Sequence, residues 1–161
     1  MNLYQAEMDQ QGATVGLGPQ RLDLATALRE ERVSAPYRGR AVVVGIRPEH
    51  LDDAARASGE GGSRRLEGTV DLVEELGSEK LVHFHIDAAR LSTTDALLAS
   101  EDEEPDTLEA GEIGSAIATA GVARVAADSR VAADQQVVFS VETERLHPFD
   151  PETGSRLGNA Q

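Results

Sequence analysis

The sequence predicts a mainly β protein, a small barrel or sandwich with little helix. Short segments in which apolar and polar residues alternate recur along the chain, and glycine-rich turns separate them. The 161 residues contain no cysteine, no tryptophan and only two tyrosines and three phenylalanines. A chain of this length can bury a core of its own, and here that core must be built largely from Val, Leu, Ile and Ala.

A β-hairpin is the clearest element. Residues 66–74 alternate, and the turn at residues 75–79 leads into a second alternating run at residues 80–86. We expect one face of the first run to carry Leu66, Gly68, Val70 and Leu72. In the second run we expect one face to carry Val82, Phe84 and Ile86, and the other to carry Leu81, His83 and His85.

Further segments complete the β-rich pattern. Residues 41–46 form a continuous apolar run, typical of a strand buried on both faces. Residues 136–141 alternate, so that Val137, Phe139 and Val141 face inward. We also expect strands at residues 3–8, 20–24 and 121–126, a hairpin or loop at 12–19, and a helical turn or two at 26–32.

The chain reads as a single region over residues 1–161 with two connecting segments. Residues 57–65 are rich in glycine and serine and predict a flexible linker. Residues 100–112 begin with a block of carboxylates and predict an acidic, solvated loop.

Charge and hydropathy exclude several function classes. The formal net charge of −14 disfavours nucleic acid and anionic lipid as partners, because both attract Lys and Arg. The low aromatic content also disfavours the stacking platforms of single-strand binders. No apolar run is long enough to span a bilayer, and residues 1–7 resemble no secretory leader, so we expect a cytoplasmic chain without cofactors.

No pattern indicates catalysis. A phosphate-binding loop ending in Gly-Lys-Ser/Thr does not occur, so we expect no ATP hydrolysis by these residues. The carboxylate-rich stretches lack calcium-loop spacing, and no nucleophile elbow is present. His83 and His85 on one strand face would form a metal site only if His50, His147 or a carboxylate converged on them; a face turned to solvent or a polar partner is the simpler interpretation.

The segment Arg47-Pro48-Glu49-His50 forms a charged corner after the strand at residues 41–46. Pro48 restricts Arg47 to extended backbone and ends the strand. Arg47 and Glu49 could form a charge pair, with His50 capping or bridging. We interpret the corner as structural, and contact with a partner protein remains the alternative.

Four motifs occur in order along the chain: Met1-Asn2-Leu3, Val44 to Leu51, Leu66 to Glu79, and Leu146 to Gly154. Together they resemble the regulatory region, with its TOBE module, that follows the nucleotide-binding domain in sugar-importer ATPases of the maltose, trehalose and glycerol-phosphate class. Glu75, Gly77 and Ser78 belong to the second of that region's signatures.

The resemblance implies OB-like (TOBE) β-barrels with one or two short helices, arranged as two intertwined subdomains. It implies a homodimer, a nucleotide-binding domain upstream in the full-length protein, and indirect contact with permease subunits at the inner membrane. Such a domain would act as a passive anchor for paired ATPase subunits.

Two other classes stay open. A stand-alone molybdate-type oxyanion module shares TOBE-like architecture, although the acidic charge suits an anion site poorly. An OB-fold nucleic-acid binder is disfavoured by charge and ring content. An enzyme is the weakest alternative.

Overall fold

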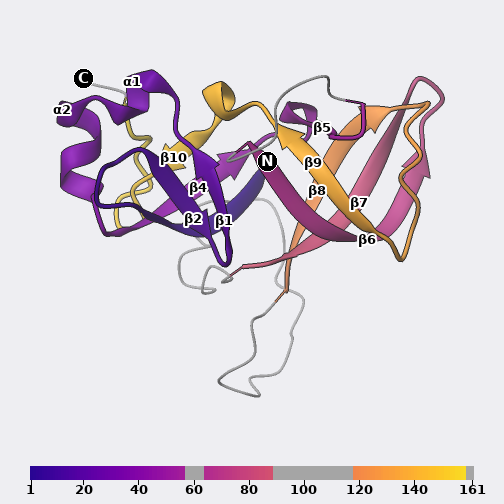
Figure 1. Cartoon of the computed structure of the whole chain (residues 1–161), viewed down its shortest axis with the longest axis horizontal. Coiled ribbons are helices and arrows are strands. Elements are labelled where there is room, and N and C mark those ends of the chain that lie inside the picture. The colour runs from indigo at the N-terminus through magenta and orange to yellow at the C-terminus, as the bar shows by residue number, and fades with distance from the viewer. Residues whose placement is uncertain (57–63, 89–117, 159–161) are drawn as a thin grey trace, which may run out of the picture.

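The computed structural model describes residues 1–56, 64–88 and 118–158, and these residues form two antiparallel five-stranded sheets (Figure 1). The mainly β prediction is therefore confirmed. The linker predicted over residues 57–65 lies mostly outside the described residues, and the acidic loop predicted over residues 100–112 lies wholly outside them.

The first sheet has the strand order β10-β4-β1-β2-β3. Strand β1 pairs with β4 from Asn2 opposite Ile46 to Glu7 opposite Ala41. Strand β4 is buried from Val42 to Ile46, as its continuous apolar run predicts. The strands are β1 (Asn2–Met8), β2 (Thr14–Leu17), β3 (Gln20–Asp23), β4 (Ala41–Ile46) and β10 (His147–Phe149).

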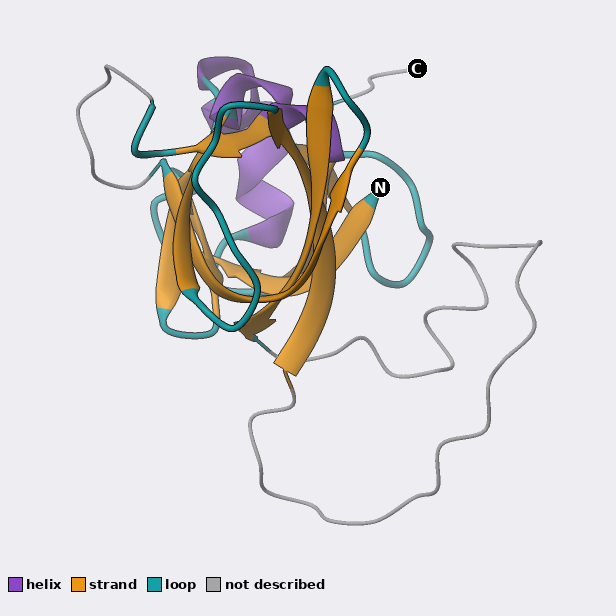
Figure 2. Cartoon of the chain, turned by 90° about the vertical axis from the view of Figure 1, so that its right-hand side faces the viewer, coloured by secondary structure: helices purple, strands orange, loops and turns teal. Residues whose placement is uncertain are grey.

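The second sheet has the order β5-β9-β6-β7-β8, and its edge strands β5 and β8 lie against each other. The sheet therefore curls into the partly open five-stranded barrel typical of OB folds. Figure 2 shows its strands curving around a common interior. The strands are β5 (Leu51–Asp53), β6 (Arg65–Glu75), β7 (Glu79–Asp87), β8 (Ala118–Ala126) and β9 (Gln136–Val141).

Within the described residues, helical structure is confined to short segments, as predicted. Helices α1 (Thr26–Arg29) and α2 (Glu31–Ser34) follow β3 and lie at the end of the molecule formed by the first sheet (Figure 1). The described part of the chain also forms the 3-10 helices η1 (Ala35–Tyr37), η2 (Pro48–His50) and η3 (Thr143–Arg145).

The predicted face of strand β6 is wrong at one residue. Leu66, Gly68 and Val70 are buried, but Leu72 is 52% exposed. The register against β7 shifts between Val70 and Leu72, so Asp71 is an extra, bulged residue. A bulge moves the following residues to the opposite face, and Val73 therefore turns towards the core in place of Leu72.

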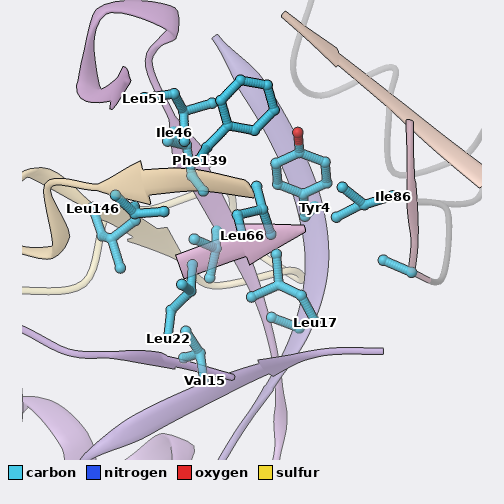
Figure 3. Close-up of a cluster of buried hydrophobic side chains, with 14 of the residues drawn as sticks. Tyr4, Val15, Leu17, Leu22, Ile46, Leu51, Leu66, Ile86, Phe139 and Leu146 are labelled. Carbon is cyan, nitrogen blue, oxygen red and sulfur yellow. The ribbon is translucent and has the colours of Figure 1, made fainter. Parts of the chain in front are cut away.

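One hydrophobic cluster joins the two sheets. Phe84 and Phe139 pack against each other with ring centroids 4.6 Å apart and ring planes tilted by 46°, and Tyr4 of the first sheet packs into the same cluster. Figure 3 shows side chains from both sheets converging there. The inward faces predicted for β7 and β9 are confirmed, because Val82, Phe84, Val137 and Phe139 are all buried.

Two side-chain amides fasten one sheet to the other. Asn2 of β1 donates to the carbonyl of Val122 and accepts from its N–H, both at 2.8 Å. Gln20 of β3 makes the same pair of bonds with Glu67, at 2.8 Å to the carbonyl and 2.6 Å from the N–H. Each side-chain amide hydrogen-bonds both the N–H and the carbonyl of one backbone residue, as a neighbouring strand would, and so pairs backbone groups that the strands of the sheet leave unpaired.

Candidate functional site

The charged corner begins where strand β4 ends. Arg47 is extended, with φ −77° and ψ 145°, and Pro48 opens the 3-10 helix η2. Gly45, just before the corner, allows β10 to pass closely, because a Cβ there would lie 3.1 Å from the Phe149 ring and 3.3 Å from the His147 carbonyl. The corner therefore sits over the pairing of β4 with the C-terminal strand.

The corner carries a loose ion pair on its surface. Arg47 Nη1 lies 3.8 Å from Glu49 Oε1, and both side chains are about half exposed. A hydrogen bond from its own backbone N–H, followed by the proximity of His50, Arg47 and Arg124, holds the pKa of Glu49 below its usual range. An exposed pair of this geometry contributes little to stability.

The second signature forms the turn between β6 and β7. Leu76 N donates to the Glu79 carbonyl at 2.9 Å, and Gly77 adopts φ +86°, a conformation that glycine accepts without strain. Glu75 is exposed and pairs with Lys80 at 3.4 Å. Ser78 makes no side-chain hydrogen bond within the described residues.

Arg124 of β8 connects the two signatures. Its Nε lies 3.2 Å from Glu79 Oε2 at the end of the turn, and its charge also acts on Glu49 in the corner. The structure therefore brings the corner and one end of the hairpin turn to the same side of β8. Sequence reasoning missed Arg124, because nothing in its local pattern distinguishes it from any exposed arginine on a strand.

His50 and His147 approach each other where η2 meets β10. Their ring centroids are 6.5 Å apart, and His50 Nδ1 and His147 Nε2 are buried without a hydrogen-bond partner in the part of the chain that the structure describes. Burial, followed by the nearby charges of Arg156, Arg47 and His50, lowers the pKa of His147. The neutral form of His147 is therefore favoured in the folded protein.

His83 and His85 do not join that pair. Each bonds a carboxylate on the neighbouring strand β6: His83 Nε2 lies 2.5 Å from Glu74 Oε1, and His85 Nδ1 lies 2.7 Å from Asp71 Oδ1. In the described parts of the chain no group of three or more His, Asp or Glu side chains is arranged to hold a metal ion.

Two family models match this chain. The MalK OB fold domain matches residues 1–51, and the TOBE domain matches residues 44–113. The corner falls within both matches, and the hairpin turn falls within the second. The chain therefore belongs to the family that joins a MalK-type OB fold domain to a TOBE domain, and the resemblance carried by the four motifs is confirmed.

Relatives with assigned functions are ATP-binding subunits of importers. The chain is 31% identical over 159 residues to the trehalose import ATP-binding protein SugC of Mycobacterium tuberculosis, covering 98% of this chain and 38% of that protein. It is 31% identical to the sn-glycerol-3-phosphate import ATP-binding protein UgpC of Chromobacterium violaceum, covering 99% and 32%. It is 38% identical over 87 residues to the trehalose/maltose import ATP-binding protein MalK of Thermococcus litoralis, covering 53% and 23%.

The chain thus spans less than two fifths of the length of these relatives. In the residues that the structure describes, no helix is both long and apolar enough to cross a membrane.

Proposed function

We propose that this chain is the C-terminal regulatory and dimerisation region of the ATP-binding subunit of an ABC importer for sugars or related solutes. One observation carries the proposal: the similarity to such subunits is continuous over 98% of the chain and includes both domain models. Its relatives are importer subunits, which does not favour a stand-alone molybdate-type module.

The proposed role is mechanical. Because both sheets share one hydrophobic core, the region can move as a rigid body. Two copies packed together would keep a pair of ATPase subunits joined while their nucleotide-binding domains open and close. The chain itself does not hydrolyse ATP in this proposal, and its contact with the permease at the inner face of the membrane is indirect.

The corner and the hairpin turn fit this role as an outer face of the anchor. Arg47, Glu49 and Arg124 are about half exposed and Glu79 is partly exposed, and these charges of both signs lie where η2 and the hairpin turn meet β8. Exposed charges of both signs select a partner's orientation more than they add affinity. We therefore propose that Arg47, Pro48, Glu49 and His50 first stabilise the junction of β4 and β10. The charged groups of Arg47 and Glu49 would in addition contact a protein partner.

A chimeric importer tests the proposal. The region of the Mycobacterium tuberculosis trehalose import ATP-binding protein that aligns with this chain is replaced by residues 1–161, and trehalose uptake and ATPase activity are measured. We expect uptake to be retained. A chimera that assembles and hydrolyses ATP but no longer couples hydrolysis to uptake would contradict the proposal.

The isolated chain gives a second test. Light scattering should show dimers at high concentration, and the chain should not turn over ATP. A strict monomer at every concentration would count against the anchor role, and ATP turnover by the isolated chain would contradict the assignment.

A further inference from the structure

The outer face of the first sheet carries an open groove of about 460 Å³. It lies opposite the core: Tyr4, Ala6 and Met8 of β1 point inward, so Gln5 and Glu7 point into the groove. The remaining walls come from the neighbouring strands and turns. The lining includes Gln5, Glu7, Thr14, Gly16, Arg21 and Ala41.

The strand register places an acid and a base on opposite sides of a glycine. Glu7 pairs with Gly16, and Gly16 pairs with Arg21. Adjacent strands are about 4.8 Å apart, so the backbones of Glu7 and Arg21 are separated by roughly twice that distance. In the described residues neither side chain has an ion-pair partner.

The fold does not require a glycine at position 16. Its φ lies outside the left-handed region, and a Cβ built there would meet nothing closer than 3.8 Å. Other strand glycines differ: a Cβ would lie 2.8 Å from the Phe84 side chain at Gly68 and 2.2 Å from the Tyr4 hydroxyl at Gly121. The structural consequence of glycine at position 16 is that the floor of the groove stays open between two unpaired charges.

The lining defines the chemistry of an occupant. Glu7 accepts hydrogen bonds, Arg21 donates them, and the Gln5 amide does both. Among the described residues, no aromatic or large exposed apolar side chain lines the groove. Asp9 adds a second carboxylate to the lining, and its oxygens already accept from the Ala13 N–H and the Thr14 hydroxyl. An occupant must therefore be small, polar and without negative charge, with donors and acceptors on all sides.

We propose that this groove binds a mono- or disaccharide. The hydroxyl groups of a sugar both donate and accept, so one molecule can bond Glu7 on one wall and Arg21 on the other. If the proposed function holds, on which this role rests, the groove would let an ATP-binding subunit sense the sugar that its importer delivers.

Calorimetry on the 161-residue chain with trehalose and with maltose tests the proposal. We expect saturable binding of at least one sugar. Gly16→Val fills the floor without backbone strain and should weaken binding at least tenfold, and Arg21→Gln should weaken it measurably through loss of the guanidinium. Arg65→Gln is the matched control, because Arg65 is also exposed and without an ion pair in the described residues but lies outside this groove.

Three outcomes would overturn the proposal: no saturable binding of either sugar, equal binding by the parent chain and by both groove variants, or saturable binding of the zwitterionic dipeptide lysylglutamate without sugar binding. Circular dichroism and thermal melting establish whether each variant is folded. If Gly16→Val does not fold, Arg21→Gln still tests the proposal. Loss of the sugar site would leave coupling in the chimeric importer intact, so the two proposals fail separately.

Discussion

Tyr4, His50 and His147 bury polar atoms that have no hydrogen-bond partner among the described residues. The Tyr4 side chain is fully buried, and burial raises the pKa of its phenol above the ordinary range. An unpaired buried hydroxyl lowers the free energy of unfolding relative to a well-packed apolar ring. Its space exists because Gly121 has no side chain.

Gly121→Ala should lower the free energy of unfolding by about 1–3 kcal/mol, because its Cβ would lie 2.2 Å from the Tyr4 hydroxyl. Tyr4→Phe alone should be neutral or slightly stabilising, and it should recover part of the loss when combined with Gly121→Ala. Urea unfolding followed by circular dichroism measures all three. Strictly additive effects would show that the hydroxyl and the new methyl group do not compete for the same space.

His147 predicts acid sensitivity. Because burial and nearby arginines lower its folded pKa, its stabilising contribution is complete above the unfolded pKa of about 6.5 and is lost as the pH falls through the folded pKa. His147→Phe should therefore flatten the decline in stability just below pH 6.5. Unfolding midpoints between pH 7.5 and pH 5 measure this effect.

Carboxylates provide the contrast for that experiment. The hydrogen bond with Arg56 holds the pKa of Asp128 below its usual range, so its contribution is lost only as the pH falls below about 4. If the unfolding midpoint of His147→Phe falls as steeply as that of the parent chain between pH 6.5 and pH 5, the acid sensitivity belongs to other groups.

At the level of strands and turns, the hydrogen bonds of two side-chain amides and the bulge at Asp71 organise the fold. Asn2 and Gln20 bond backbone groups of β8 and β6, where the ladder leaves those groups open. The bulge exposes Leu72 and lets Asp71 meet His85 on the outer face. Neither device follows from alternation within a single strand.

Asn2→Ala should lower the free energy of unfolding by about 1–3 kcal/mol, because it leaves the Val122 N–H and carbonyl without their partner. Gln20→Ala should cost less, about 1 kcal/mol or below, since its bonds with Glu67 are exposed to water. Hydrogen exchange should accelerate at the Val122 amide in Asn2→Ala and remain unchanged there in Gln20→Ala. Equal protection of Val122 in the parent chain and Asn2→Ala would contradict the role given to Asn2.

At the level of the whole molecule, the chain leaves the first sheet after β4, builds the second sheet, and returns to the first with β10. Side chains from both sheets fill one core. Neither sheet can therefore lose its packing without exposing the other, which favours cooperative behaviour.

We expect a single unfolding transition for the described fold. Calorimetry should give a van't Hoff enthalpy close to the calorimetric enthalpy, and circular dichroism should report the same midpoint. Two resolved transitions would show that the sheets unfold independently and would weaken the rigid-anchor proposal.

The sequence by itself determined the class of fold and most strand positions, because alternation and glycine turns are local signals. Apolar alternation placed Val82, Phe84 and Phe139 inside correctly, and the motif around Pro48 located the end of β4. Four ordered motifs also led to the family that the comparisons then showed.

Only the tertiary structure decided which distant residues meet. The bulge that exposes Leu72 depends on the register of two strands, and the ion pair between Arg124 and Glu79 depends on where β8 lies. The groove between Glu7 and Arg21 exists because three strands bring those two residues to either side of Gly16. Contacts of this kind are set by packing between segments far apart in the chain, and no local pattern encodes them.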